Sequence, residues 1–428
     1  MDSSVYWYGA RRPQVQPLNT SLTTGVVVVG GGIAGLTCAH ALAARGVDVV
    51  LVEDAYCGAG ASGKSSGFIT PDSELELSDL IANYGAARGQ ALWEFARSGV
   101  ERIRGTISAL AIDCDYQVQD SLMVASSNWA LRRVIALEHR THAALGYHST
   151  LYDRASLGAV LGSRTYQGGI RYGGTFAMNA FAYCRALRDA IIRQGVRVFE
   201  GSRVLRLTPQ GVETAGGSVT APAVAVLTDR YLPALGLATD TVHHIQSFLA
   251  ISRPLDGHEI RIIFPGDRLM VWDTDIVYKY FRITGEGRLL IGGADLRSMY
   301  SEREGGASAR VSIVLRRHVS THFPSLDLEL EHLWSGLIGV SPDFAPVAGR
   351  HADFPRVYFA GAGAGLPWSA ALGAYLADKI TSGRAELDEV FSPSRSFLIR
   401  GWPLHLMGKA ASFAASHGIA KYSRRLRP

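Results

Sequence analysis

Cysteine is scarce in this sequence of 428 residues, and its few copies form no metal-binding pattern. The four cysteines, Cys38, Cys57, Cys114 and Cys184, have neither CxxC spacing nor a histidine cluster nearby. Their arrangement excludes the common zinc motifs and a disulfide framework, and it is typical of free thiols in a reducing compartment. We therefore expect no metal site.

Long apolar runs and a strong charge of one sign are also missing. Glycine aside, runs such as Val26 to Val29 are far too short to cross a bilayer, and no apolar signal segment follows Arg11 and Arg12. The 43 basic and 38 acidic residues leave a net charge of +5, which is mild for this length. These features predict a cytoplasmic protein with no nucleic-acid partner.

The remaining composition is that of an ordinary globular protein. Hydrophobic residues make up 47% of the chain and charged residues 19%. The length exceeds what one small core needs, so we expect two closely associated domains. Glycine is abundant, with 47 residues, as in proteins with many tight turns and close backbone approaches.

A strand–helix–strand unit is predicted near the N-terminus. Gly25–Val29 is a β-branched run typical of a strand buried on both faces. Helical spacing of apolar residues follows from Ile33 to Arg45, Gly46 ends this helix, and Val47–Val52 predicts a second buried strand. This order implies two parallel strands joined by a right-handed crossover.

The link between the first strand and the helix carries a nucleotide-binding fingerprint, GxGxxG, at Gly30, Gly32 and Gly35. The first glycine permits a tight turn, the second lets a pyrophosphate approach the backbone, and the third lets the helix pack on the strand. The helix N-terminus favours the negative charge of the phosphates. Glu53 closes the second strand, where it is placed to accept hydrogen bonds from ribose hydroxyls.

Two further loops are rich in small residues. Gly58–Gly67 reads GAGASGKSSG, and Phe359–Pro367 reads FAGAGAGLP between a predicted strand and a predicted helix. Both offer backbone donors to a long, flat ligand. The backbone amides at the start of the helix predicted after Phe359–Pro367 would stabilise negative charge on a flavin ring.

The rest of the chain predicts a mixture of helices and short strands after an irregular arm at 1–24. Helices are expected at 75–110, 129–145, 180–195, 307–320 and 369–381, and strands at 196–207, 217–221, 223–227, 260–264, 269–272, 276–283, 289–292, 336–340 and 357–359.

These segments resemble the D-amino-acid oxidase superfamily of flavoproteins, in particular its bacterial members of the γ-glutamylputrescine, sarcosine and glycine oxidase kinds. The likeness covers most of residues 5–385, and Tyr6-Trp7-Tyr8 looks like the start of some members. Four segments carry it in the usual order: the unit ending at Glu53, the GASGKSSG loop, Tyr280-Phe281-Arg282 leading into Gly287–Gly293, and Ser341–Pro346 followed by Gly361–Gly365.

The resemblance implies an α/β (α+β) two-domain fold, with a Rossmann-like FAD-binding domain on a parallel sheet and a substrate domain on an antiparallel sheet. The implied FAD-binding domain covers 20–100, 178–245 and 335–385, the substrate domain covers 101–177 and 246–334, and 386–428 form a basic and apolar tail. The residues implied to bind FAD are Gly30, Gly32, Ile33, Ala34, Gly35, Glu53, Asp54, Gly60, Ala61, Ser62, Lys64, Ser65, Ser66, Gly67, Val204, Gly361, Gly363, Gly365, Leu366 and Pro367.

The implied activity is hydride transfer from the carbon next to an amine to flavin N5, followed by imine hydrolysis, with O2 or another electron acceptor. Tyr278, Tyr280 and Arg282 alternate along one predicted strand and so face one side. We expect Arg282 to pair with a substrate carboxylate and the tyrosines to close the pocket; the alternative for Arg282 is a structural role. A 2-hydroxy acid dehydrogenase and a flavin-binding subunit without turnover remain open.

The sequence departs from the family pattern at three places. Neither Trp334–Leu337 nor the GASGKSSG loop holds the Cys or His of covalent members, so we expect non-covalent FAD. Leu290 aligns with the lysine that helps sarcosine-type oxidases use O2, which leaves the acceptor open and Lys64 or Lys279 as substitutes. The tail from 386 either packs on the FAD-binding domain or makes weak membrane contact.

Overall fold

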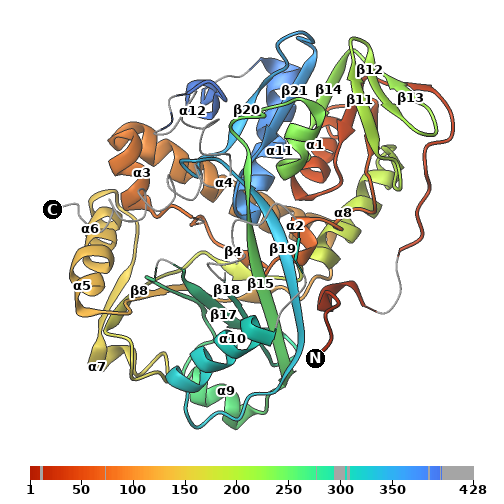
Figure 1. Ribbon diagram of the computed structural model, residues 1–428. Coiled ribbons are helices and arrows are strands. Elements are labelled where there is room, and N and C mark those ends of the chain that lie inside the picture. The colour runs from red at the N-terminus through yellow and green to blue at the C-terminus, as the bar shows by residue number, and fades with distance from the viewer. Residues whose placement is uncertain are drawn as a thin grey trace.

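The computed structural model describes residues 1–9, 13–72, 74–275, 277–293, 304–305, 309–383, 386–395 and 397. Within these residues the strands form four sheets, of six, eight, four and three strands. Figure 1 shows the six-stranded sheet in the upper part of the molecule and the eight-stranded sheet in the lower part, with two long strands running between them.

The six-stranded sheet, which we call the parallel sheet, contains the predicted strand–helix–strand unit. Its order is β10 (Arg197–Phe199), β3 (Val49–Val52), β2 (Val26–Val29), β14 (Ala223–Val226), β21 (Val357–Gly361) and β20 (Val347–Arg350), with all pairs parallel except β21–β20. Val26 and Val28 of β2 point into one hydrophobic core, and Val27 and Val29 point into another. The strand is therefore buried on both faces, as its β-branched run predicts.

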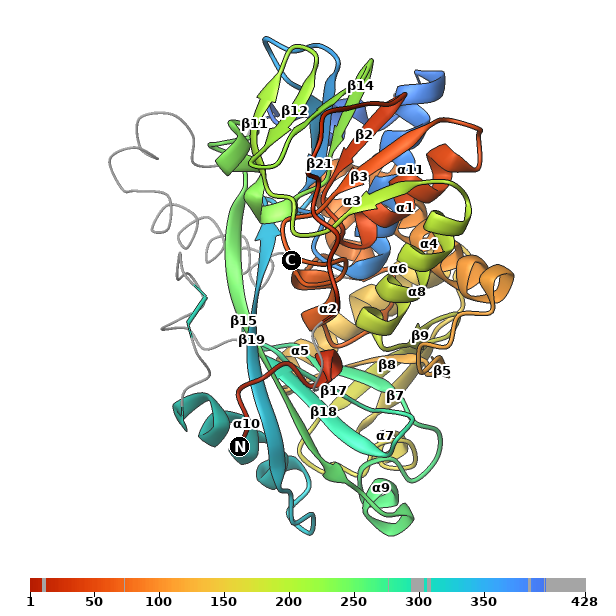
Figure 2. The same cartoon turned by 90° about the vertical axis from the view of Figure 1, so that its right-hand side faces the viewer.

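Helices cover one face of the parallel sheet and a β ribbon covers the other (Figure 2). The helices are α1 (Ile33–Ala43), α8 (Ala180–Arg193), α11 (Leu366–Ser382) and, farther out, α4 (Ala86–Leu110). The ribbon has the order β1 (Leu22–Thr23), β13 (Ser218–Thr220), β12 (Gly211–Thr214) and β11 (Val204–Thr208), and the 3-10 helix η3 (Asp229–Leu235) packs on the same face.

The eight-stranded sheet, which we call the large sheet, is antiparallel apart from the pair β16–β6. Its order is β19 (Leu330–Val340), β15 (His243–Pro254), β18 (Arg288–Gly293), β17 (Lys279–Ile283), β16 (Met270–Asp273), β6 (Ser121–Val124), β8 (Gly168–Tyr172) and β7 (Thr150–Asp153). Helices α9 (Gly257–Ile263) and α10 (Ala309–His322) cover one of its faces, where Ile263, Phe281 and Leu315 share a core.

Shorter elements fill the space between and around the two sheets. They are η1 (Tyr6–Tyr8), α2 (Ala61–Lys64), α3 (Leu77–Tyr84), α5 (Asn128–Ala130), η2 (Leu131–Ile135), α6 (Ala136–Ala144), α7 (Arg154–Leu157), α12 (Asp388–Phe391) and a small sheet of β4 (Phe68–Ile69), β9 (Phe176–Ala177) and β5 (Gln117–Val118). In the part of the chain that the structure describes, no helix is both long and apolar enough to cross a membrane.

The two long strands β15 and β19 join the two halves of the molecule. They pair from His243 with Val340 to Ser252 with Leu330. Near one end the Gly339 N–H donates to Asp229 of η3 at 2.7 Å, and farther along β15 pairs with β18 of the large sheet. The domain boundaries expected after residues 245 and 334 thus fall inside continuous strands instead of linkers.

The predicted elements are largely present with shifted ends, but the strand expected at 260–264 is wrong, because most of it belongs to helix α9. Asp256 caps this helix: its Oδ1 accepts from the N–H groups of His258 and Glu259, both at 2.8 Å. The Glu259 carboxylate in turn accepts from the Asp256 N–H at 2.9 Å. This capping box starts a helix over a run whose apolar residues otherwise favour a strand.

Candidate active site

The glycines of the fingerprint lie where a side chain has no room. Gly30 has a φ of +108°, and a Cβ atom there would come within 2.6 Å of the Leu227 carbonyl oxygen. A Cβ atom on Gly35 would lie 1.8 Å from the Gly30 carbonyl oxygen. Gly32 is the N-cap of α1. The turn therefore brings bare backbone and a helix N-terminus together, an arrangement that fits a pyrophosphate.

Glu53 follows β3, and its carboxylate faces the glycine turn. Oε2 accepts from the Gly31 N–H at 2.6 Å, and Oε1 accepts from the Ala55 N–H at 2.9 Å. Burial raises the pKa of Glu53, although the two N–H donors oppose the shift. The next residue, Asp54, is exposed. Glu53 lies beside the turn, as a ribose ligand must, and the ribose contact itself stays a prediction.

Three side-chain N–H groups hold three successive carbonyls of the GASGKSSG loop. The pairs are the Lys64 carbonyl with Trp334 of β19 (2.9 Å), the Ser65 carbonyl with Trp7 of η1 (3.0 Å) and the Ser66 carbonyl with Arg282 of β17 (2.8 Å). Earlier in the loop, Ser62 Oγ accepts from the Ile33 N–H of α1 at 3.1 Å. The loop is thus fixed to the large sheet, the N-terminal arm and α1 together.

A half-buried aspartate holds the third small-residue loop. Asp229 Oδ1 accepts from the Ala362 N–H at 3.0 Å, and Oδ2 accepts from Gly339 of β19. Ala362 has a φ of +54°, which residues other than glycine adopt rarely. The loop then leads to Gly365, the N-cap of α11, with Pro367 in the first turn. Asp229 thereby positions the N-terminus of α11.

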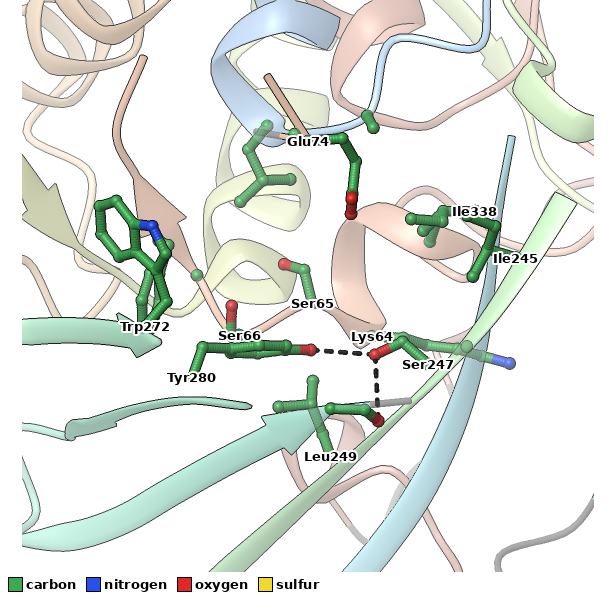
Figure 3. Close-up of a pocket in the computed structure, with 18 of the residues that line it drawn as sticks. Lys64, Ser65, Ser66, Glu74, Ile245, Ser247, Leu249, Trp272, Tyr280 and Ile338 are labelled. Carbon is green, nitrogen blue, oxygen red and sulfur yellow. Dashed lines mark hydrogen bonds between the residues drawn. The ribbon is translucent and has the colours of Figure 1, made fainter. Parts of the chain in front are cut away.

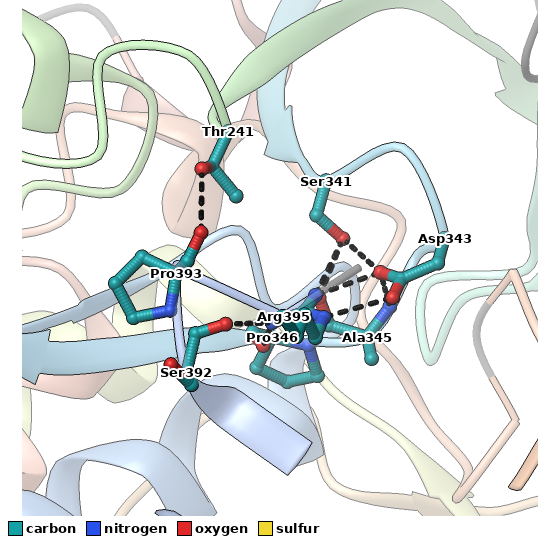
Figure 4. Close-up of polar contacts among 8 residues, drawn as sticks. All are labelled: Thr241, Ser341, Asp343, Ala345, Pro346, Ser392, Pro393 and Arg395. Atoms are coloured by element: carbon teal, nitrogen blue, oxygen red, sulfur yellow. Dashed lines mark hydrogen bonds and ion pairs between the residues drawn. The ribbon is translucent and has the colours of Figure 1, made fainter. Parts of the chain in front are cut away.

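An arginine from the start of the tail holds the Ser341–Pro346 segment (Figure 4). Arg395 donates to both carboxylate oxygens of Asp343, at 2.8 and 2.7 Å, and to the Ala345 and Pro346 carbonyls. Just before it, α12 buries Phe391 completely. Residues 386–395 therefore pack on the parallel-sheet half. The rest of the tail, apart from 397, lies outside the described residues, and so does the expected membrane contact.

A cavity of about 1260 Å³, including its open mouth, lies where these loops meet the large sheet. Lys64–Gly67 and Ala364–Pro367 line it from the loops, and Ser247, Leu249 and Tyr280 line it from the strands. Figure 3 shows Glu74 across the cavity from Tyr280 and Leu249, with Trp272 at one end. The cavity therefore brings the two predicted loops and the predicted strand face together.

Arg282 does not line this cavity, which corrects its expected role as a partner for a substrate carboxylate. The side chain is fully buried, and its guanidinium donates to the carbonyls of Ser66 and Met178, the latter at 3.1 Å. Burial lowers the pKa of Arg282 to about 10. Gly67 leaves room for the guanidinium to reach the main chain. The geometry assigns Arg282 to anchoring the loop.

The two tyrosines do line the cavity, and both are hydrogen-bonded. The Tyr280 hydroxyl lies 3.1 Å from Ser247 Oγ, and the Tyr278 hydroxyl donates to Glu74 at 2.8 Å. Burial raises the pKa of Tyr280 to about 12 and that of Tyr278 well above its usual value. Both hydroxyls therefore stay protonated at neutral pH, so neither acts as a base.

The two lysines considered as substitutes for the oxidase lysine have other partners. Lys64 lines the cavity, but its Nζ pairs with Glu304 at 2.5 Å. Lys279 Nζ donates to the Val277 carbonyl at 2.9 Å. Leu290 is buried in an apolar cluster with Leu249 and Trp334. None of the described residues that line the cavity is a cysteine or a histidine, in keeping with the expectation of non-covalent FAD.

The predicted FAD residues divide into two groups and a remainder. The glycine-turn group is Gly30, Gly32, Ile33, Ala34, Gly35, Glu53 and Ser62, and the cavity group is Ala61, Lys64, Ser65, Ser66, Gly67, Gly365, Leu366 and Pro367. Gly60 and Asp54 are exposed, and Val204 packs half-buried on the ribbon side. Gly361 ends β21, and Gly363 belongs to the loop that Asp229 holds.

Sequence reasoning missed several residues that hold these loops. Trp7 belongs to a motif that the sequence does display, but nothing in that motif indicates its contact with Ser65. Asp229, Trp334 and Arg395 carry no local signal, because each acts on a segment at least 49 positions away in the chain, 110 in the case of Asp229 and Gly339.

Known proteins are similar to this chain in sequence and in fold. Residues 25–379 match the family described as FAD dependent oxidoreductase. The chain is 30% identical over 365 residues to gamma-glutamylputrescine oxidoreductase of Escherichia coli (strain K12), covering 80% of this chain and 81% of that protein. It is 24% identical to D-amino acid dehydrogenase of Methylobacterium sp. (strain 4-46), covering 85% and 96%. Glycine oxidase from Geobacillus kaustophilus has a similar structure, with a TM-score of 0.74, 18% identity and coverage of 88% and 100%.

The local geometry agrees with this match. A Cβ atom on Gly30 or Gly35 would collide with backbone, so these two positions need glycine for the tight turn and for the close packing of α1 that the FAD-binding fingerprint requires. Since the family match spans most of the chain and the fold accords with it, the chain belongs to the FAD-dependent oxidoreductase family that includes the D-amino-acid oxidases.

Proposed function

We propose that the protein oxidises the C–N bond of an amine or amino acid. The carbon next to the nitrogen gives up a hydride, and the nitrogen loses a proton. The acceptor for the hydride and its two electrons would be supplied by bound FAD. Water then converts the imine to a carbonyl compound and ammonia or a smaller amine, and O2 or another acceptor takes up the electrons.

The observation that carries the proposal is the cavity between the anchored loop and the large sheet. The glycine turn and Glu53 would hold the nucleotide end of FAD. The segment Lys64–Gly67 and the N-terminus of α11 would flank its ring system inside the cavity. The dipole of α11 favours negative charge on the ring nearest its N-terminus.

The names of the related proteins support chemistry at a C–N bond. They refer to gamma-glutamylputrescine, D-amino acids and glycine, and each of these compounds carries an amine. The first of these relatives is similar over most of its length, so a shared reaction class is a reasonable extension to this chain.

The residues around the cavity would orient the substrate and exclude water. The protonated hydroxyl of Tyr280 offers a hydrogen bond, and Leu249 and Trp272 present apolar surface. Proximity of the C–H bond to the cofactor supplies much of the rate in such a site. No side-chain base is required if the amine binds in its neutral form.

The oxidation of a 2-hydroxy acid is less well supported. A hydroxy acid carries a carboxylate, and the arginine expected to bind it serves main-chain carbonyls instead. Among the described residues that line the cavity, Asp72 and Glu74 would repel a carboxylate, and Lys64 is paired with Glu304. The geometry therefore favours an amine without a carboxylate over a hydroxy acid, and it favours such an amine over an amino acid for the same reason.

The test is the visible spectrum of the purified holoenzyme, recorded without oxygen while amines, amino acids and 2-hydroxy acids are added in turn. We expect the flavin band near 450 nm, a wavelength typical of oxidised flavins, to bleach with amines or amino acids. Bleaching by hydroxy acids alone would reassign the substrate. A yellow protein that no compound bleaches would indicate a flavin-binding subunit without turnover.

The electron acceptor is tested separately. Because Leu290 places an apolar side chain where an ammonium promotes the reaction with O2 in the sarcosine-type relatives, we propose that O2 is a poor acceptor. Reduced holoenzyme mixed with air-saturated buffer in a stopped-flow instrument should reoxidise no faster than free reduced flavin. Much faster reoxidation would identify an oxidase.

A further inference from the structure

One end of the cavity carries acidic side chains that the proposed chemistry does not use. Asp72 and Glu74 line this end, and an oxygen of Glu76 lies within 4.8 Å of one of Asp72. Thr70 donates to Asp72 Oδ2 at 2.7 Å, Tyr278 donates to Glu74 at 2.8 Å, and Trp272 Nε1 donates to Glu76 Oε1 at 3.2 Å. Neutral donors therefore hold these carboxylates in place.

Two carboxylate oxygens of this group have no hydrogen-bond partner among the described residues: Asp72 Oδ1 and Glu76 Oε2. The Asp72 side chain lines the cavity although only 5% of the residue is exposed. Burial, and then the charge of Asp72, raise the pKa of Glu76 well above its usual value. Without a cation, the two groups must share a proton and leave one buried charge unbalanced, which is costly.

Among the described residues, the neighbouring ionisable groups offer only one cation: His142, whose charge lowers the pKa of Asp72, is itself paired with Glu138 at 3.1 Å. Glu138 accepts from the main-chain N–H groups of Leu77 and Ser78 and from His142, so it adds negative charge. Lys64 is the one basic residue among the described residues lining the cavity, and its Nζ lies 2.5 Å from Glu304. The acidic end is thus ready to accept a positively charged group from a ligand.

Aromatic side chains lie beside the same carboxylates. Tyr278 and Trp272 line the cavity and bond to Glu74 and Glu76, and Tyr280, across the cavity from Glu74 (Figure 3), has its ring centroid 5.8 Å from that of Tyr278. An ammonium group within about 6 Å of such a ring is attracted to its face. Carboxylates and aromatic faces together form a setting suited to an alkylammonium rather than to a carboxylate.

We propose that the substrate is an amine with a second, distal ammonium group and no carboxylate, and that Asp72 and Glu74 bind this distal ammonium. Its other C–N bond then lies against the cofactor and undergoes the oxidation. This assignment rests on the proposed function and narrows it to diamines and related polyamines. Asp72 and Glu74 determine specificity by charge and take no part in the chemical step.

The test compares compounds that differ only at the distal end. Butane-1,4-diamine, butylamine and 4-aminobutanoate place an ammonium, a methyl and a carboxylate group there, and the same end groups on longer chains extend the series. The rate of FAD reduction in the holoenzyme is measured without oxygen at a series of substrate concentrations. We expect diamines to exceed monoamines by about tenfold or more, with the carboxylates slowest.

Variants identify the residues responsible. Asp72→Asn and, separately, Glu74→Gln should lower the diamine-to-monoamine ratio by about tenfold. Asp240→Asn, which removes an exposed carboxylate, should leave the ratio unchanged. A ratio that Asp72→Asn and Glu74→Gln both preserve, or a carboxylate compound that is the best substrate, would overturn the assignment.

Binding without turnover separates the two proposals. Titration calorimetry with butane-1,4-diamine, tetramethylammonium and butanoate should show binding of the cations, weakened about tenfold by Asp72→Asn. If no compound reduces FAD but the cations bind in this way, the proposed reaction fails and the cation site stands. If butanoate binds as tightly as the cations, or Asp72→Asn has no effect, the cation site fails whatever the reaction.

Discussion

At the scale of single residues, two side chains on the same side of one strand can have different roles when one lines a cavity and the other is buried. Tyr280 and Arg282 are two positions apart on β17 and point to the same side of the large sheet. The hydroxyl of Tyr280 lines the cavity, whereas the guanidinium of Arg282 is fully buried against the carbonyls of the loop. Strand alternation predicts the shared side, but it does not predict which polar partner each side chain meets.

Replacement of Arg282 should therefore weaken the loop rather than the affinity for a carboxylate. In Arg282→Lys the single ammonium cannot serve both the Ser66 and the Met178 carbonyls, so a buried acceptor loses its partner. We expect a loss of about 2 kcal/mol in the free energy of unfolding, measured in urea, together with weaker FAD binding. The control Arg261→Lys changes an exposed arginine on α9. An Arg282→Lys protein as stable as this control would contradict the anchoring role.

At the scale of elements, the contact between α1 and α11 depends on the absence of a side chain. A Cβ atom on Gly373 of α11 would lie 2.1 Å from the Ala34 carbonyl oxygen of α1. Both helices also begin at loops of the candidate site, α1 after the glycine turn and α11 after the loop held by Asp229. Their close packing therefore sets the distance between the two helix N-termini.

Gly373→Ala should disturb both helices at once. We expect it to lower the free energy of unfolding by about 2–3 kcal/mol, since main-chain atoms must move, and to weaken FAD binding. Gly105→Ala is a matched control in α4, exposed and with open space around its Cβ position, and it should raise stability by about 0.5–1 kcal/mol. Equal stability of the two variants would show that α1 and α11 separate at little cost.

Helix α10 gives the fold a dependence on pH. Burial lowers the pKa of His318 to about 3 and that of His322 to about 4, with nearby Lys279 adding to the first shift and Asp275 opposing the second. An unfolded histidine titrates near about 6.5, so the unfolded chain binds more protons below that pH. Stability is then full above pH 6.5 and falls as the pH decreases toward 4.

The prediction is tested by urea unfolding at several pH values between 7.5 and 4.5. His318→Gln should reduce the slope of unfolding free energy against pH by about one proton. His148→Gln, which changes an exposed histidine, serves as the control. A slope that His318→Gln leaves as steep as in the control would assign the pH dependence to other groups.

At the scale of the whole molecule, structure encoded in neighbouring residues could be predicted from the sequence, whereas contacts between residues far apart in the chain could not. The unit from Gly25 to Glu53 was predicted because strand, turn, helix and acidic residue follow one another directly. The helix at Gly257–Ile263 was missed although Asp256 and Glu259 form a capping box, because its apolar residues were taken for a strand. Sheet order and the contacts of Trp7, Asp229 and Arg395 join segments far apart in the chain, so no local pattern specifies them.

The manner in which FAD is held is also a property of the whole molecule. Because the described cavity lining includes neither cysteine nor histidine, precipitation with acid should leave all of the flavin in the supernatant. Added FAD should raise the melting temperature of the apoprotein, since a ligand that binds the folded state stabilises it. Yellow colour that remains in the acid pellet would indicate a covalent link.

The continuous pairing of β15 with β19 restricts how a substrate can enter. These strands contribute Leu249 and Trp334 to the cavity wall, and their other ends reach Asp229 of η3, which packs on the parallel sheet. A hinge movement of one half of the molecule against the other would bend these two strands or break the hydrogen bonds that pair them. Substrate must therefore enter, and product must leave, through local movement at the cavity mouth. Turnover should not require the two halves of the molecule to move relative to each other.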